Sequence, residues 1–234
     1  MVKKRYSHIV FLPTPKYRVS NIVIKEFYTQ RIRRRLTRHL NNLQIWKMGR
    51  RVARHLPPTK GAPVIFFKAS SGIDDFSWNA AFHLLSSWAF RLQGIPVRFF
   101  ACNAGMTHCV LGTNREHVAQ KPPCKSCVYQ SKTLYTGADA NWFSFNGDEE
   151  LDRALVNLSL ADLQQFNFNG IPLGELSLPG LRWILRRHHL VDDEKTRYLL
   201  REYIRSAWNI AQKFELMIKG EKPRAVVVFN GQMY

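Results

Sequence analysis

The chain has 234 residues, of which 45% are hydrophobic, so it is long enough to bury a core and is not a disordered protein. No stretch reaches the ~20 apolar residues of a membrane-spanning helix, and the apolar run Ile9–Leu12 is too short for a signal peptide. We therefore expect a cytoplasmic protein. Its net charge of +18 favours partners that carry negative charge.

The positive charge is concentrated near the N-terminus. Residues 1–55 contain 15 Lys and Arg residues against one acidic residue, Glu26, whereas residues 56–234 contain 20 basic and 16 acidic residues. The sequence therefore predicts a basic helical arm and linker over residues 1–60, followed by a nearly neutral domain over residues 61–234.

The basic arm contains a long helical segment. From about Ile22 to about Arg54 there is no proline and a single glycine, Gly49, which predicts one long helix or two helices that meet there. Apolar residues recur at helical spacing among the arginines: Ile32, Leu36, Leu40 and Leu43. Residues 22–55 can be interpreted as a helix on an anionic membrane surface, as a nucleic-acid-binding arm, or as a helix packed on the domain with its arginines in solvent. The leucine and aromatic content favours the membrane over nucleic acid.

The remaining sequence predicts a Rossmann-like α/β domain, a mostly parallel sheet with helices on both faces. Val64–Phe67 and Ala225–Phe229 are continuous apolar runs, typical of strands covered on both sides. A helix over about Trp78–Leu92 and a strand over Ile95–Ala101 complete a β-loop-α-β unit with parallel strands. Trp142–Phe145 is a further candidate strand. Helical segments follow, one near Leu181–His188 and the clearest beginning at Asp192. Because the last strand is followed by only a few residues, we expect a truncated domain whose sheet is incomplete at the C-terminus.

Polar loops follow three of the predicted strands, at the edge where open α/β sheets bind ligands. Their candidate ligand-binding residues are Ser70, Ser71, Gly72, Asp74, Asp75, Asn103, Gly105, Asn230 and Gly231. The first loop offers hydroxyls and carboxylates just before a helix, although Asp75 or Ser77 would also serve as the cap of that helix. The loop is not a phosphate-binding glycine-rich fingerprint, since it contains no G-x-G-x-x-G and no Walker-type lysine.

All four cysteines lie within 26 residues, in an insert over residues 102–140 that we expect to be a structured loop or small subdomain. They are Cys102, Cys109, Cys124 and Cys127. The closing C-x-x-C pair resembles half of a zinc knuckle, and His108 or His117 would be able to replace one ligand. A structural zinc site, free buried thiols and, less readily, a redox pair are the alternatives.

Several segments of the domain resemble bacterial capsule-biosynthesis and glycosyltransferase-like proteins of surface-polysaccharide assembly, which have the GT-B architecture. The segments are Val64–Asp75, Cys102–Met106 continuing through Cys109 to Gly112–Arg115, Pro122–Cys127, Ile171–Glu175, Pro179–Trp183 and Val227–Gly231. In that architecture two Rossmann-like domains face each other across a cleft, and the N-terminal domain contacts the acceptor.

The resemblance implies that this chain is the acceptor-side half of a protein that transfers sugar from a nucleotide-sugar donor to a glycan or lipid-linked acceptor. The donor would bind a missing C-terminal domain, so the fragment alone would be inactive. Asp74 or Asp75 would be the catalytic base, and the other loop residues would bind the acceptor. Zinc would then be structural, and the basic helix would suit an enzyme peripheral on the inner face of the membrane. The alternative is a noncatalytic nucleic-acid-binding protein with a zinc knuckle and a basic arm.

Overall fold

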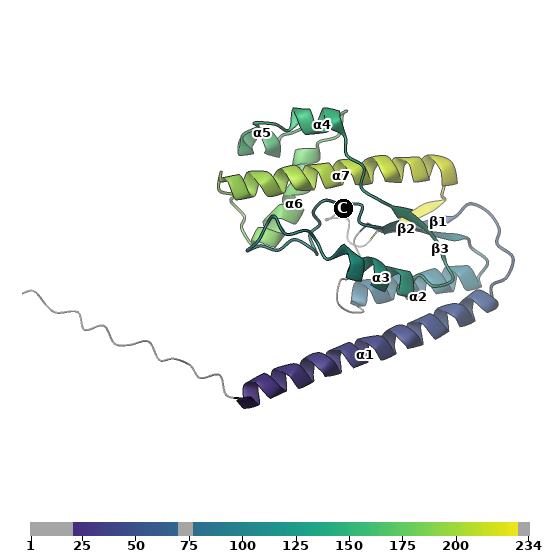
Figure 1. Ribbon diagram of the computed structural model, residues 1–234. Coiled ribbons are helices and arrows are strands. Elements are labelled where there is room, and N and C mark those ends of the chain that lie inside the picture. Colours follow the sequence, from purple (N-terminus) through teal and green to yellow (C-terminus); the bar gives the residue numbers. More distant parts are fainter. Residues whose placement is uncertain (1–20, 70–76, 229–234) are drawn as a thin grey trace, which may run out of the picture. The chain divides into compact units, whose positions relative to one another are not determined.

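The computed structural model describes residues 21–69 and 77–228 (Figure 1). Its centre is an open, four-stranded sheet of order β3-β2-β1-β4 in which every neighbouring pair is parallel. The strands are β1 (Val64–Lys68), β2 (Val97–Cys102), β3 (Asp139–Phe143) and β4 (Ala225–Val227). The helices are α1 (Asn21–Arg54), α2 (Trp78–Leu92), α3 (Cys124–Leu134), α4 (Glu149–Ala154), α5 (Leu160–Gln164), α6 (Leu173–Leu185) and α7 (Glu194–Glu221). The predicted Rossmann-like α/β class is confirmed.

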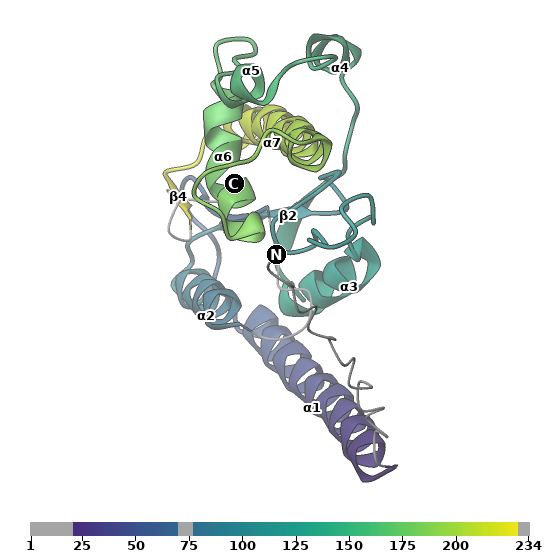
Figure 2. The same ribbon diagram turned by 90° about the vertical axis from the view of Figure 1, so that its left-hand side faces the viewer.

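The strands are covered on both faces because their side chains alternate between the two sides of the sheet. Phe66 of β1 belongs to an apolar cluster that includes Leu84 of α2 and Leu134 of α3. Its neighbour Ile65 belongs to a second cluster, which includes Ile210 of α7. Accordingly, α2 and α3 lie on one side of the sheet and α7 on the other (Figures 1 and 2). This double cover explains why the strands are continuous apolar runs.

A further apolar cluster is formed mainly by α4, α5, α6 and α7, on the outer side of the layer that covers the sheet. Its most deeply buried members include Leu163, Leu181 and Tyr203. The helix predicted to begin near Leu181 is α6, which begins earlier, at Leu173, and contains Pro179. The Pro179-Gly180 pair is typical of a helix break, but here Gly180 lets α6 approach its neighbours, since a Cβ there would lie 2.9 Å from Val110 Cγ2.

The contacts divide the chain into two units, Met1–His39 and Leu40–Tyr234, and the sheet with its covering helices belongs to the second. Helix α1 continues through Gly49 without a break, so the single-helix alternative is confirmed. Gly49 is buried, and a Cβ there would lie 3.0 Å from the Thr136 carbonyl oxygen. Among the described residues, no helix combines the length and apolar character needed to cross a bilayer.

The insert that we expected to be a loop or small subdomain contains the eleven-residue helix α3, which the sequence did not lead us to expect. The mixed composition of α3 shows little helical periodicity. Pro123 at its N-cap and the buried side chain of Leu134 in its last turn fix where the helix lies. The strand predicted at Trp142–Phe145 is β3, which begins earlier, at Asp139.

A buried pair of amides joins α1 to α3 and gives a first test of the packing. Asn42 Nδ2 donates to Gln130 Oε1 at 2.8 Å, and Gln130 Nε2 donates to Asn42 Oδ1 at 2.9 Å. Asn42→Leu leaves a buried amide unsatisfied, so we expect it to lower the free energy of unfolding by about 1–3 kcal/mol in urea titration.

The double variant Asn42→Leu/Gln130→Leu should recover part of that loss, because both polar partners are then removed. Gln44→Leu, at an exposed position of the same helix, serves as the control. Strictly additive losses in the double variant would contradict a coupled amide pair.

Candidate functional site at the carboxyl edge of the sheet

The order of the strands fixes where a ligand site is expected. From β1 the chain moves outward through β2 to β3, and it then returns to place β4 on the opposite side of β1. Such a reversal leaves a crevice between the two strands at their carboxyl ends, where α/β sheets bind ligands. The reversal here lies between β1 and β4, which pair in register from Val64 with Ala225 to Phe66 with Val227.

The predicted loops follow the two strands on either side of this reversal. Ser70, Ser71, Gly72, Asp74 and Asp75 follow β1, whereas Asn230 and Gly231 follow β4. These seven residues lie outside the described residues, so their catalytic and acceptor-binding roles stay predictions. The alternative role of capping α2 falls to Ser77, whose Oγ accepts from the Ala80 N–H at 3.2 Å.

The other two predicted ligand-binding residues lie in the loop after β2. Asn103 Nδ2 donates to Ser144 Oγ at 3.1 Å, and the Asn103 N–H donates to the Phe143 carbonyl at 2.8 Å. Gly105 is buried, and a Cβ there would overlap the Phe143 ring. Both residues therefore tie the end of β2 to the end of β3, and their binding role stays a prediction.

Three polar side chains of α7 hold this loop in place. Asn209 Nδ2 donates to the Gly105 carbonyl at 2.8 Å, and Ser206 Oγ accepts from the His108 N–H at 3.3 Å. Glu202 Oε2 lies 3.6 Å from His108 Nδ1. These residues recur at helical spacing, i, i+4 and i+7, on one side of a long helix. The three polar residues are visible in the sequence at this spacing. They were missed because only the apolar face of the helix was considered.

His108, a predicted alternative metal ligand, is engaged elsewhere. Its Nε2 lies 2.8 Å from the Val118 carbonyl oxygen, while its Nδ1 faces Glu202. Burial opposes ionisation of Glu202, but the charge of Arg205, whose Nη1 donates to Glu202 Oε1, and neighbouring polar groups outweigh it and lower its pKa from 4.5 to about 2. Arg205 therefore holds an ionised carboxylate beneath the loop.

Two buried basic groups near the end of β1 were not singled out from the sequence. Lys68 is the last residue of β1 and His83 lies in α2, and both are almost fully buried. Burial lowers the pKa of Lys68 from 10.5 to about 8, against the opposite effect of a thiolate at Cys127. Burial and the charge of Lys68 lower the pKa of His83 to about 4, so His83 is neutral at pH 7. A lysine at the end of an apolar strand is the sequence feature that indicates this site.

The four cysteines come from different structural elements and meet at one cavity of about 20 Å³. Cys102 ends β2, Cys109 lies in the following loop, and Cys124 and Cys127 lie in the first turn of α3. Burial raises the pKa of Cys102 to about 11 and that of Cys109 to about 12. With only protein atoms around them, both side chains are therefore neutral thiols at pH 7. Within the described ranges, no three His, Cys, Asp or Glu side chains are arranged as a ready-made metal site.

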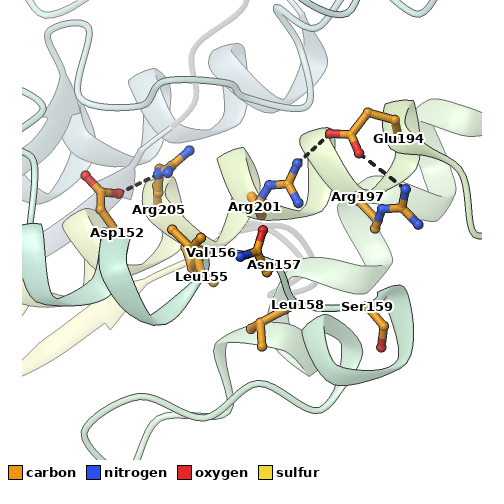
Figure 3. A pocket seen from close by; sticks show the side chains of 10 residues that line it. All are labelled: Asp152, Leu155, Val156, Asn157, Leu158, Ser159, Glu194, Arg197, Arg201 and Arg205. Carbon is orange, nitrogen blue, oxygen red and sulfur yellow. Dashed lines mark hydrogen bonds and ion pairs between the residues drawn. The ribbon is translucent and has the colours of Figure 1, made fainter.

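A cavity of about 610 Å³ lies elsewhere and is lined by α7 and by the segment from α4 to α5 (Figure 3). Arg197, Arg201 and Arg205 line it at four-residue spacing. Figure 3 shows Glu194 between Arg197 and Arg201, at 3.3 and 2.7 Å, and Asp152 against Arg205 at 2.6 Å. Asp192 also pairs with Arg197 and Glu202 with Arg205. Four carboxylates therefore face three arginines, and this group has no excess positive charge with which to attract an anion.

Comparisons with protein-family models, with curated proteins and with solved structures gave no significant match to this chain. We therefore infer its function from the sequence and from the geometry described above.

The ionised Glu202 predicts how stability depends on pH. Its pKa is lower in the folded protein than the ordinary 4.5, so its stabilising effect is complete above about pH 4.5 and is lost as pH falls towards 2. We expect Glu202→Gln to lower the free energy of unfolding by about 1–3 kcal/mol at pH 7, and the difference from the wild type to shrink as pH approaches 2. Urea titrations over this pH range measure both effects.

Glu215→Gln is the matched control, because Glu215 lies on the same helix and its ion pair with Lys219 is exposed. Wild-type and Glu202→Gln curves that stay parallel from pH 7 to pH 2.5 would contradict the assigned role of Glu202.

Proposed function

We propose that this chain is the acceptor-side half of a glycosyltransferase-like protein of bacterial surface-polysaccharide assembly, with two Rossmann-like domains in the GT-B arrangement. The observation that carries the proposal is the reversal of strand order between β1 and β4. The carboxyl ends of β1 and β4, which the two predicted polar loops follow in the sequence, meet beside this reversal, where such domains bind their ligands. The resemblance of the segments around these loops supplies the reaction class.

The proposed reaction joins an acceptor hydroxyl to the anomeric carbon of a sugar. As that bond forms, the bond from the anomeric carbon to the donor phosphate breaks and a nucleotide leaves. Asp74 or Asp75 would accept the proton of the hydroxyl, and Ser70 and Ser71 would orient the acceptor. The nucleotide sugar would be held by a second domain outside this sequence.

We also propose that α1 places the protein on an anionic membrane, where a lipid-linked acceptor resides. Ile32, Leu36, Leu40 and Leu43 are all exposed. The face of α1 that packs in the core is a different one, because Ile45 is buried and lies roughly 200° around the helix from Leu43. The apolar stripe is therefore separate from the buried face of α1.

The charges beside this stripe favour an anionic surface. Arg33, Arg34, Arg35 and Lys47 are exposed, and the described part of α1 from residue 27 onward contains no acidic residue. Basic side chains next to exposed leucines are typical of helices that lie in the headgroup region of a membrane. Nucleic acid would use the same charges, but it would not need the leucines.

Binding of an acceptor to the whole chain tests the proposed site. We expect saturation-transfer NMR to detect one or more oligosaccharides from a panel of surface-polysaccharide repeat units. Removing two charged hydrogen-bonding groups in Asp74→Asn/Asp75→Asn should weaken that binding at least ~10-fold. Glu215→Gln, an exposed carboxylate on α7, is the control. Binding that is absent, or equally strong in the double Asp variant, would contradict the proposed acceptor site.

Vesicle binding tests the membrane partner. We expect co-sedimentation with vesicles that contain phosphatidylglycerol and little with phosphatidylcholine alone. Leu36→Ser/Leu40→Ser removes apolar burial without changing charge and should weaken the binding by about 10-fold or more. Gln44→Ser is the exposed control on the same helix.

Retention on heparin separates the two kinds of partner. The Leu variant should keep the retention of the wild type, because its arginines are unchanged. Unchanged vesicle binding by the Leu variant would contradict a leucine-mediated membrane contact. The binding would then be due to the basic side chains alone.

A further inference from the structure

The chain has four cysteines, and all of them line the same small cavity. Free cysteines that serve only as small apolar side chains are expected to be spread among the cores of a protein. Here two of the three apolar clusters contain no cysteine, although together they include most of the buried residues. Convergence from β2, a loop and α3 therefore requires an explanation other than packing.

Two of the thiols lie in short loops that share a sequence pattern. Both loops have the sequence Cys-x-x-Gly, Cys102–Gly105 and Cys109–Gly112. The Gly105 N–H donates to Cys102 Sγ at 3.2 Å, whereas the Gly112 N–H donates to the Cys109 carbonyl oxygen at 3.1 Å. A hydrogen bond to sulfur stabilises a thiolate more than a thiol. At Cys102 this hydrogen bond therefore opposes part of the effect of burial on the pKa of the thiol.

The second glycine also closes the cavity. A Cβ at Gly112 would lie 2.6 Å from Pro122 Cβ and 3.1 Å from Cys109 Sγ. Only a glycine allows the loop of Cys109 to approach the segment that leads into α3 this closely.

The remaining two thiols come from the first turn of α3. Cys124 and Cys127 are three residues apart, so they lie on the same side of the helix. The start of this eleven-residue helix, where the helix dipole is positive, also favours negative charge. Lys68, a buried cation within electrostatic reach of Cys127, offsets part of the charge of a group of thiolates.

We propose that Cys102, Cys109, Cys124 and Cys127 bind one zinc ion as a closed tetrathiolate site. Four thiolates complete the tetrahedral coordination that zinc prefers, and leave no position for a substrate. The cavity of about 20 Å³ holds one particle, since a single water needs roughly 10–15 Å³, so a single ion fits better than a multi-iron cluster. Binding deprotonates the thiols and draws the sulfur atoms to about 2.3 Å from the ion.

The site would be structural and independent of the proposed sugar transfer. It would connect the end of β2 to the first turn of α3, and so fix the loop that contains Asn103 and Gly105 at the carboxyl edge. Sequence spacing alone left free thiols and a redox pair as alternatives, whereas the common cavity and the N–H that Gly105 donates to Cys102 favour metal.

Metal content of the purified full chain tests the proposal. We expect about one zinc per chain by elemental analysis, and loss of most of it in Cys102→Ser, Cys109→Ser, Cys124→Ser and Cys127→Ser. Ser126→Ala is the matched control, because Ser126 lies between two of the ligands on α3 but is exposed. Zinc retained at full stoichiometry by any of the four Ser variants would overturn the four-ligand assignment.

Cobalt substitution of the wild type keeps the proposal testable if the Ser variants do not fold. Refolding the chelator-treated chain with Co²⁺ should give the intense visible bands of a tetrahedral thiolate site, and added Zn²⁺ should abolish them. A chain that binds neither metal, with all four thiols reactive towards a thiol reagent, would overturn the proposal. Iron with inorganic sulfide in the purified protein would overturn the choice of a single zinc ion.

Discussion

Strand β1 is the element on which the rest of the domain depends, because the strand order reverses beside it and it pairs with a strand on each side. Its parallel pairing with β2 sets Lys68 opposite Ala101, and its pairing with β4 sets Phe66 opposite Val227. These registers bring the ends of the strands to one edge. Lys68 ends β1 at that edge, and Cys102, which lines the cysteine cavity, ends β2 there.

Helix α7 is the second element on which the domain depends. It contributes side chains to two apolar clusters and hydrogen-bonds the loop after β2. Ile210 and Met217 cover the sheet, whereas Leu200 and Tyr203 pack in the helical layer. Between these apolar contacts, its polar side chains hold the loop after β2. A loop tied by buried hydrogen bonds to a long helix is a rigid support, as a binding or metal site requires.

Much of the fold was predictable from local features, whereas the site depends on residues far apart in the sequence. The bounds of α2 were predicted as the structure has them, because Ser77 caps its start and Gly94, with φ of 77°, follows its end. Helix α3 and the early start of α6 were missed, because tertiary packing outweighs the prolines and the weak periodicity of these segments. Spacing indicated a metal site in the C-x-x-C pair, but it did not show that the other two cysteines reach the same cavity. The contact between Glu202 and His108 joins residues 94 positions apart, and nothing local indicates it.

X-ray absorption at the zinc edge of the purified chain shows most directly whether a cysteine-bound ion organises the carboxyl edge of this sheet. We expect four sulfur neighbours at about 2.3 Å from zinc and no lighter neighbour. A shell of nitrogen or oxygen neighbours, or a chain without zinc, would contradict this organisation and return the four cysteines to the apolar core.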